Sequence, residues 1–471
     1  SDARDLHFAQ YIANRTTDAQ AREQFGAIVH FVGGEDGGVE EVTEADREWL
    51  LFHSQEPTGA VAEAPEAILR RLTEPVLFGQ KGLAILRTPH GPQTQAALLR
   101  WGPSVKHGQF DDLNLNYYAL GWEVTYDIGY GWANTNTQVG WADQTASHNL
   151  VMVNESSQRP SGEDGTGGSL RAMAAMPGLS LVDADANGVY RSQGVEGYRR
   201  MIALIGEGPG SYLLDLFTVA GGRQHDYLMH ALSDQVAFEG VTISERAEGS
   251  LAGPETNYGE RQLPDGFISG LERRNYWAPP PENGFGFLMH PRRGTPEGAW
   301  SATWTLPSGE DRFRITMPAQ EGVEVVNAWA PGITPTWPHA EYVMVRRSGE
   351  EGLRSTFAAV LEPIGAQHPR VGLSATELLA AARTGDGTLK HVPTQDGVLL
   401  FQANEVGGRA EITLTAPEAG EYRLHIRPCL SPAYGSCRFL LDGQPVIEQW
   451  SGRGDVVRAA EALTTEPLAL T

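Results

Sequence analysis

The feature that most constrains the fold is a succession of short strand-like runs from Pro75 onward, which glycine and proline residues interrupt at short intervals. Asp112–Tyr117 shows the pattern clearly, because its polar and apolar residues alternate with period two. In a strand this alternation would place Leu113, Leu115 and Tyr117 on one face. Such runs, separated by turns, predict a large antiparallel β structure.

The composition also divides the chain. A length of 471 residues exceeds what one hydrophobic core usually organises, so we expect more than one domain. Residues 1–74 carry helical patterns, such as the capping-box-like start at Thr43, whereas residues 75–370 have the strand pattern. Residues 382–471 predict a small β-sandwich with fewer strands than a closed jelly roll needs. Sugar binding and a packing role are both open for it.

Charge and composition narrow the choice of partners. The formal net charge of −23 argues against nucleic acid as a partner, and no apolar run is long enough to span a membrane. Cys429 and Cys437 could link neighbouring strands or remain two free thiols. An anionic substrate would need a local basic cleft, although paired arginines at strand ends are more often structural. The candidate pairs are Arg199-Arg200, Arg273-Arg274, Arg292-Arg293 and Arg346-Arg347.

The segment Lys106–Gln158 carries the candidate site. His107 enters one predicted strand, Asp127 leaves the next, and His148 enters a third. On one sheet these side chains would converge on a single face, where they could bind a metal or move protons. From the residues alone, a buried His148 bonded to backbone and a turn-capping Asp127 would be the preferred interpretation.

The same segment contains an ordered series of motifs. It runs from His107-Gly-Gln-Phe-Asp through Asp127-Ile-Gly-Tyr to Gln144-Thr-Ala-Ser-His-Asn. The series resembles the sandwich-domain signature of the heparinase II/III-like polysaccharide lyases, an architecture shared with oligoalginate lyases and dermatan sulfate epimerase. Further motifs, such as Ser211-Tyr-Leu-Leu-Asp, extend the resemblance over roughly Val76 to Pro363.

The resemblance implies a mainly β fold: a large antiparallel β-supersandwich preceded by a few helices and followed by a small, carbohydrate-binding-like β-sandwich. In the family a large α/α toroid precedes the sandwich, so residues 1–74 are expected to be its end or its remnant. We therefore expect the chain to be a fragment or a processed form, which would explain why it begins at Ser1 without a signal peptide. The family also implies a secreted or periplasmic protein.

The activity implied by the resemblance is that of a polysaccharide lyase acting on a uronic-acid-containing anionic polysaccharide, such as alginate or a glycosaminoglycan. In this β-elimination a base removes the C5 proton and an acid assists loss of the O4 leaving group, while the adjacent carboxylate is neutralised. The family's catalytic histidine maps onto His107. Tyr130 is a second candidate, for catalysis or for substrate contact. Residues 1–74 offer no clear counterpart of the toroid's catalytic residues.

The family's metal ligands map onto Gln109, Asp127 and His148. Gln109 departs from the pattern, because the family has a histidine there. An amide oxygen is a weaker and harder ligand than imidazole, which makes zinc less favourable and manganese, calcium or no metal more favourable. One divalent ion is therefore an expectation left open.

Three further residues are candidate substrate contacts. Trp132 and Trp141 lie in a loop rich in Asn and Thr, where a sugar ring could stack on an indole, although core packing is commoner for Trp. Asn149 follows His148 directly.

Two alternatives to the lyase remain. A uronate C5-epimerase would share the proton abstraction, and a non-catalytic carbohydrate-binding or structural sandwich would need no catalytic residue. Neither the oligomeric state nor the polysaccharide is specified by the sequence.

Overall fold

The structure is a computed structural model, and it describes residues 74–89, 94–103, 108–129, 137–159, 167–208, 210–259, 280–332, 339–365, 375–392, 398–414, 420–426, 428–454, 458–459 and 463–470. Contacts divide the chain into two compact units, Ser1–Pro75 with Arg87–Pro92, and Val76–Leu86 with Gln93–Thr471. The helices predicted in residues 1–74 lie outside the described residues.

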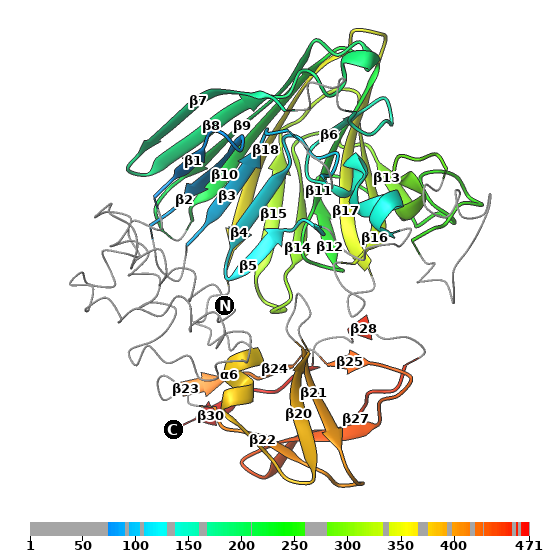
Figure 1. Ribbon diagram of the computed structural model, residues 1–471. Helices are drawn as coiled ribbons and strands as arrows, with labels where there is room; N and C mark the ends of the chain where they lie inside the picture. Colours follow the sequence, from blue (N-terminus) through cyan, green and yellow to red (C-terminus); the bar gives the residue numbers. More distant parts are fainter. Residues whose placement is uncertain are drawn as a thin grey trace, which may run out of the picture. The chain divides into compact units, whose positions relative to one another are not determined.

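Three antiparallel sheets organise the described residues between Val76 and Ile364 (Figure 1). The first has the order β1-β2-β3-β4-β5: Val76–Phe78, Leu83–Arg87, Ala96–Arg100, Leu115–Ala119 and Trp122–Thr125. The second has the order β12-β14-β15-β18-β10-β9-β8-β7: Val236–Glu239, Trp300–Thr305, Arg312–Met317, Arg354–Ile364, Tyr212–Ala220, Gly197–Ile205, Leu179–Asp185 and Ser169–Met176. The third has the order β13-β16-β17-β11-β6: Met289–Gly294, Val323–Pro331, His339–Ser348, Gln224–His230 and Val151–Val153.

All three sheets contribute to one hydrophobic core. Leu115 from the first sheet, Phe217 from the second and Val343 from the third belong to the same cluster of buried side chains. Burial of this apolar surface is the main favourable term in the folding of a sandwich. The prediction of a mainly β protein built around a large antiparallel sandwich is confirmed.

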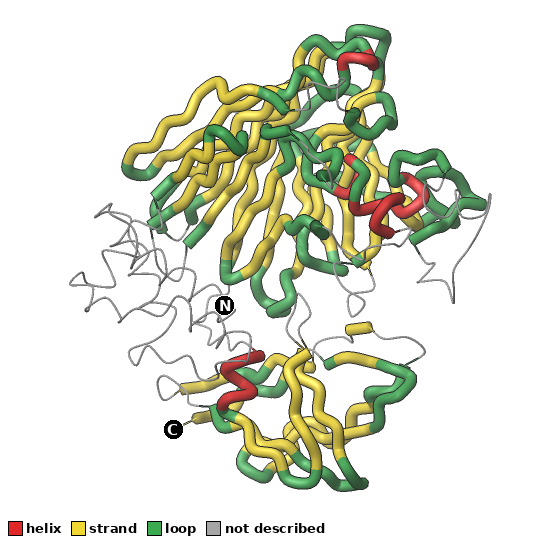
Figure 2. The backbone as a smooth tube through the Cα atoms, viewed as in Figure 1, coloured by secondary structure: helices red, strands yellow, loops and turns green. Residues whose placement is uncertain are grey.

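The third sheet is buried on both faces. Along β17, Val343 and Val345 point into the main core, whereas Tyr342 and Met344 belong to a second cluster on the opposite face. Short helical turns supply much of this second cluster: η1 (Gln138–Ala142), η2 (Thr145–Ser147) and η4 (Phe285–Phe287). A further turn, η3 (Arg191–Gln193), follows β8 in the second sheet. Figure 2 shows that strands predominate over helices among the described residues. Because strand side chains alternate, a sheet covered twice needs the nearly continuous apolar runs found here.

The strand expected at Asp112–Tyr117 begins later than predicted. β4 starts at Leu115, and Leu113 has a positive φ of 68°, which ends the extended backbone. Leu115 and Tyr117 are buried as the alternation predicted. The alternation would place the side chain of Asn114 on the face opposite Leu115 and Tyr117, yet it too is buried, and it is hydrogen-bonded. A left-handed leucine is uncommon, so the alternation alone could not reveal it.

Among the described residues of the C-terminal part there are one short helix, α6 (Ala375–Ala380), and small antiparallel strand pairs. Its described strands are β19 (Ala382–Thr384), β20 (Gly387–Val392), β21 (Val398–Ala403), β22 (Ala410–Ile412), β23 (Gly420–Tyr422), β24 (His425–Ile426), β25 (Cys429–Leu430), β26 (Ser436–Leu441), β27 (Gln444–Ser451), β28 (Arg458–Ala459), β29 (Leu463–Thr464) and β30 (Leu468–Leu470). Cys429 and Cys437 are both free thiols.

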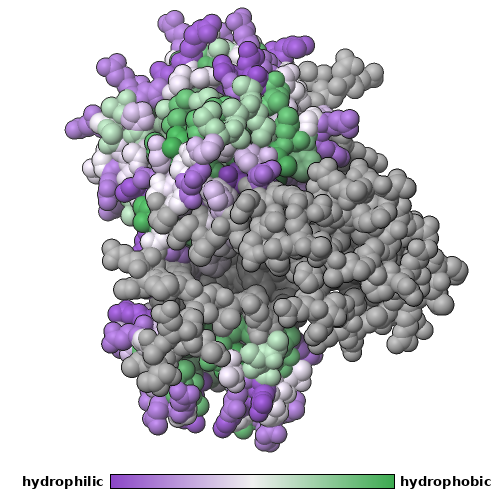
Figure 3. Space-filling view, turned by 90° about the vertical axis from the view of Figure 1, so that its left-hand side faces the viewer, coloured by the Kyte–Doolittle hydropathy of each residue, from purple (hydrophilic) through white to green (hydrophobic). Residues whose placement is uncertain are grey.

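Apolar side chains are exposed on β1 and on β7, the end strand of the second sheet. They are Leu77, Phe78, Leu170 and Met176. Figure 3, which looks at this side of the molecule, shows apolar surface among the polar residues. Exposed apolar residues on an edge strand are typical of surfaces that another segment or chain contacts. Among the described helices, none is long and apolar enough to cross a membrane.

Candidate functional site

His148 is a buried histidine at the entrance to β6. It follows η2, and only 2% of its surface is exposed. Its Nδ1 lies 2.9 Å from the carbonyl oxygen of Gln144 and 3.0 Å from the hydroxyl of Ser147. A carbonyl oxygen can only accept a hydrogen bond, so Nδ1 carries a hydrogen and donates a hydrogen bond to the carbonyl of Gln144. In the neutral imidazole, Nε2 is therefore the nitrogen with the lone pair.

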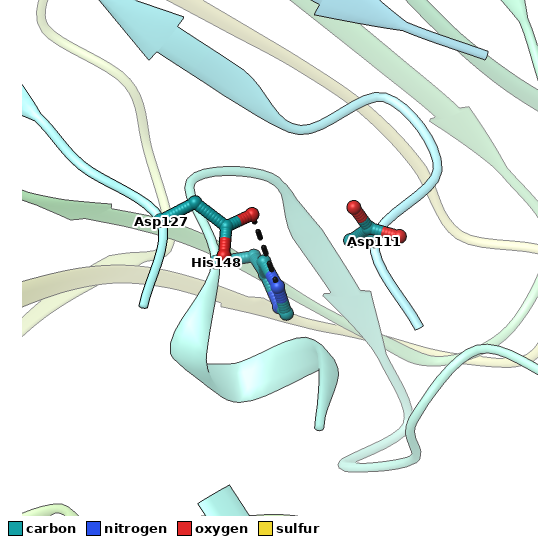
Figure 4. Close-up of side chains that lie close together, drawn as sticks. All are labelled: Asp111, Asp127 and His148. Atoms are coloured by element: carbon teal, nitrogen blue, oxygen red, sulfur yellow. Dashed lines mark ion pairs between the residues drawn. The ribbon is translucent and has the colours of Figure 1, made fainter. Parts of the chain in front are cut away.

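Two oxygen atoms face Nε2 of His148. Oε1 of Gln109 lies 3.2 Å away. Oδ2 of Asp127 lies 3.6 Å away, and Figure 4 marks this contact with a dashed line. The Gln109 amide is held in this orientation because its Nε2 donates to the carbonyl of Gly129 at 2.6 Å. A lone pair that faces only acceptors is unfavourable. A cation shared by Nε2 and the two oxygens would remove this unfavourable contact.

A second carboxylate completes the cluster. Ligand atoms of Asp111, Asp127 and His148 all lie within 4.8 Å of one another, and Figure 4 shows the three side chains around a common space. Oxygens that bind one calcium ion at 2.3–2.6 Å can be at most about 5 Å apart, so this spacing suits a single ion. Asp111 was not among the residues that the sequence predicted as ligands.

The surrounding hydrogen bonds hold both carboxylates in place. Oδ1 of Asp127 accepts from the backbone N–H of Gly129 at 2.6 Å, and Oδ2 accepts from Asn114 at 3.3 Å. Asp111 accepts a 2.5 Å charge-assisted bond from Arg100. Burial raises the pKa of Asp111 and the nearby Asp127 adds to this effect, whereas His148 and Arg100 oppose it. A bound cation would remove the repulsion between the two carboxylates.

The donor set fits a hard divalent cation better than zinc. One imidazole nitrogen, two carboxylates and one amide oxygen surround the space, and no cysteine belongs to the cluster of described residues. Zinc sites are typically built from histidine and cysteine, whereas manganese and calcium accept oxygen-rich sites. Gln109, Asp127 and His148, the three positions implied by the resemblance, do lie together.

The convergence joins two sheets, not one. Gln109 and Asp111 precede β4, and Asp127 follows β5, so all three flank the first sheet. His148 precedes β6, which belongs to the third sheet. The expectation that the side chains share one face of one sheet is therefore wrong. The cluster forms where the loops at the ends of two sheets meet.

The candidate catalytic residues His107 and Tyr130, and the candidate substrate contact Trp132, lie outside the described residues. Their assigned roles remain predictions.

Trp141 does not present an indole to solvent. It is completely buried in η1 and packs against Phe287 and Tyr342, with ring centroids 6.1 and 5.3 Å away. The expectation that it stacks on a sugar ring is wrong, because residues 138–142 form a helical turn that directs the ring inward. Trp141 is part of the layer that covers the third sheet.

Asn149 is also a structural residue. It is fully buried, its N–H donates to Asn114 at 2.9 Å, and its side-chain oxygen accepts from the N–H of His230 at 2.8 Å. These bonds occupy the side chain inside the protein, which contradicts the predicted substrate contact. Asn149 instead ties the His148 segment to β11.

The described arginine pairs are bound within the protein. Arg199 and Arg200 pair with Asp183 and Asp215, Arg293 with Glu324, and Arg346 with Asp226, while Arg292 donates to Asn327 and Arg347 to the carbonyl of Arg354. The structural alternative therefore holds for these pairs. Arg273-Arg274 lies outside the described residues.

Sequence reasoning missed one residue of the cluster, Asp111, and one residue that hydrogen-bonds to the cluster, Asn114. Asp111 closes the His-Gly-x-Phe-Asp series, so its place in the motif was the available signal. Asn114, which the alternation would place on the face opposite Leu115, bonds both Asp127 and the backbone of Asn149. Leu113, directly before Asn114, has a left-handed backbone, and the alternation of the segment does not predict that turn.

Comparison with solved structures gives only distant similarities. A heparinase III gene product is 11% identical with a TM-score of 0.41, over 72% of this chain and 42% of that one. A heparan sulfate lyase from Pedobacter heparinus is 9% identical with a TM-score of 0.42, over 81% and 48%. A galactose mutarotase-like protein from Clostridium acetobutylicum is 11% identical with a TM-score of 0.27, over 62% and 97%. The chain thus spans less than half the length of the two lyases.

No curated protein matches the sequence. The family model for the heparinase II/III-like C-terminal domain matches residues 70–340, which is more than half of the chain and includes the whole Asp111–Asp127–His148 cluster. The chain therefore belongs to the heparinase II/III-like family.

Proposed function

We propose that this chain is part of a secreted or periplasmic polysaccharide lyase that cleaves a uronic-acid-containing anionic polysaccharide by β-elimination. The observation that supports it most is the buried cluster around His148, whose Nε2 faces Gln109 and Asp127 inside the region matched by the family model. Family membership supports the choice of substrate class.

Elimination needs a base close to a site that can organise charge. In our proposal His107, two positions before Gln109 in the sequence, takes part in proton transfer at C5 or O4, and Tyr130 contributes to proton transfer or to substrate contact. The roles of Gln109, Asp111, Asp127 and His148 are to hold one divalent cation, with manganese or calcium preferred over zinc. A bound ion would supply fixed positive charge beside the site.

The proton assignment at His148 supports cation binding. The ring is fixed by Gln144 so that Nε2 points at the cluster, an arrangement common for metal-binding histidines. Among the described residues, the two carboxylates of the cluster have one arginine as an ion-pair partner, Arg100, so a cation would balance the remaining negative charge.

The activity test uses the whole gene product, because this chain spans less than half the length of the heparinase III gene product and of the heparan sulfate lyase. Alginate, heparan sulfate, chondroitin and hyaluronan would be incubated with it, and unsaturated uronate ends followed by ultraviolet absorbance. We expect new absorbance with at least one polysaccharide and its loss in His107→Ala. His290→Ala, a histidine on β13 away from the cluster, is the matched control and should keep the activity.

Other outcomes contradict the proposal. Exchange of the C5 proton with solvent deuterium and no unsaturated ends would indicate an epimerase. Binding without any turnover would indicate a carbohydrate-binding protein. Full activity in His107→Ala would refute the assigned catalytic role.

A further inference from the structure

Arg200 and Asp215 form a completely buried ion pair inside the sandwich. They lie on the neighbouring strands β9 and β10, and both side chains have no exposed surface. The pair is bidentate, with Nε to Oδ1 at 2.9 Å and Nη2 to Oδ2 at 2.6 Å. Tyr227 on β11, in the third sheet, donates its hydroxyl to the same Oδ2 at 2.7 Å. Asp215, which orients the guanidinium, is therefore held by residues of the second and the third sheet.

The remaining guanidinium nitrogen reaches the candidate cation site through the backbone. Nη1 of Arg200 donates to the carbonyl oxygens of Leu113 at 2.7 Å and of Asn149 at 2.5 Å. Leu113 comes two residues after Asp111, and Asn149 comes directly after His148. One buried cation thus joins the two loops that carry Asp111 and His148.

Stability alone is a weak reason for this pair. Burying two charges costs desolvation energy that their attraction barely repays, and apolar replacements of both partners are often neutral or stabilising. Leu113 also has an uncommon left-handed backbone, and its N–H and C=O are both occupied, by the carbonyl of Arg100 at 2.7 Å and by Arg200. Such a conformation persists where surrounding bonds fix it.

We infer that Arg200, oriented by Asp215 and Tyr227, is a positioning residue that sets the separation of Asp111 and His148. It touches neither ligand directly and acts through the carbonyls of Leu113 and Asn149. This inference rests on the proposed function for its biological purpose, because the separation matters if the cluster binds a cation. The effect of the hydrogen bonds from Arg200 to the two carbonyls can be measured in the metal-free protein.

The test replaces the whole buried network. Arg200→Met, Asp215→Leu and Tyr227→Phe are combined, so that no charge or phenol hydroxyl of the network is left unpaired. The matched control is Arg346→Met with Asp226→Leu, an ion pair between strands β17 and β11 of the third sheet that touches neither loop. Hydrogen exchange in the metal-free protein and calorimetric titration with Mn²⁺ and Ca²⁺ are measured for both.

We expect the amides of Leu115 and Asn149, which bond across the two loops, to exchange at least about tenfold faster in the network variant. The amides of β10 should stay protected, and affinity for the ion should fall about 10- to 100-fold, as for other groups that orient metal ligands. The control should match the wild type in loop exchange and in affinity.

Unchanged loop exchange in a folded network variant would overturn the inference. If the wild type binds neither ion, the cation proposal fails, and the exchange result still decides the role of Arg200. If the network variant does not fold, Arg200→Lys is measured instead. Lysine keeps the positive charge but cannot make both hydrogen bonds to Asp215 together with those to the two carbonyls. Wild-type loop exchange in that variant would likewise overturn the inference.

Discussion

Asp127 and His148 lie 3.6 Å apart, Oδ2 to Nε2, although one follows a strand of the first sheet and the other precedes a strand of the third. The carboxylate is held by Gly129 and Asn114, and the imidazole is held by Gln144. Because independent backbone segments fix both groups, their separation belongs to the fold and is present before any ligand binds. This preorganisation leads to the first two predictions.

Asp127→Asn should weaken divalent cation binding by at least about tenfold. The amide keeps an oxygen for the N–H of Gly129 but removes a charge from the cluster. Calorimetric titration of metal-stripped protein with Mn²⁺ and Ca²⁺ measures the effect. Asp183→Asn, a carboxylate paired with Arg199 away from the cluster, is the control and should bind as the wild type does. Equal affinities for the two variants would contradict the assignment.

Gln109→His should shift the preference of the site toward zinc. It replaces an amide oxygen 3.2 Å from His148 Nε2 with a second imidazole, the ligand that zinc favours over calcium. We expect the ratio of the Zn²⁺ to the Ca²⁺ binding constant to rise about tenfold or more, as measured by competition titration. A ratio that stays at the wild-type value would show that Gln109 is not a ligand.

Trp141→Ala should destabilise the protein by about 3–5 kcal/mol, because it removes a fully buried indole from between Phe287 and Tyr342. Trp141→Phe should cost much less, since the indole N–H has no hydrogen-bond partner within the described part of the chain. Urea unfolding monitored by circular dichroism measures both. A loss of polysaccharide binding in a stable Trp141→Phe protein would restore the sugar-stacking role that burial contradicts.

His230 should make the protein less stable in acid. Burial lowers its pKa to about 3, and the nearby His148 acts in the same direction while the carbonyl of Tyr126 opposes it. The unfolded chain takes up a proton below pH 6.5 and the folded chain does not. The free energy of unfolding therefore falls as pH drops from about 6.5 to about 3, by about 2 kcal/mol already at pH 5.

His230→Gln removes this titration and can still donate to Tyr126. Subtracting its unfolding free energies from those of the wild type, measured between pH 4 and 8, should isolate the slope. The matched variant His290→Gln should reproduce the wild-type curve. A His230→Gln curve parallel to the wild-type curve would show that His230 does not account for the acid sensitivity.

Sequence patterns predicted features of the fold that depend on neighbouring residues. They missed features that depend on contacts between residues far apart in the sequence. Period-two alternation placed Leu115 and Tyr117 in the core correctly. Trp141 was misjudged because Phe287 and Tyr342, which bury it, come from far along the chain. The start of β4 was misjudged because the backbone of Leu113 is set by hydrogen bonds to Arg100 and Arg200.

The residues of the candidate site were also predicted only in part. Gln109, Asp127 and His148 came from the family resemblance, and their side chains do meet. The place of Asp111 in the site depends on the approach of the loop before β4 to His148, which no local propensity encodes. Asn149 adjoins His148 in the sequence, yet its side chain points to β11 because His230 occupies its oxygen. Neighbours in sequence were thus poor guides to shared function here.

The double burial of the third sheet limits where this protein can change without unfolding. A substitution on either face of β17 meets packed side chains, Tyr342 and Met344 on one face and Val343 and Val345 on the other. Only the loops that leave the strand ends are free to vary in length and composition. Relatives with different substrates should therefore differ mainly in those loops and keep the same strands.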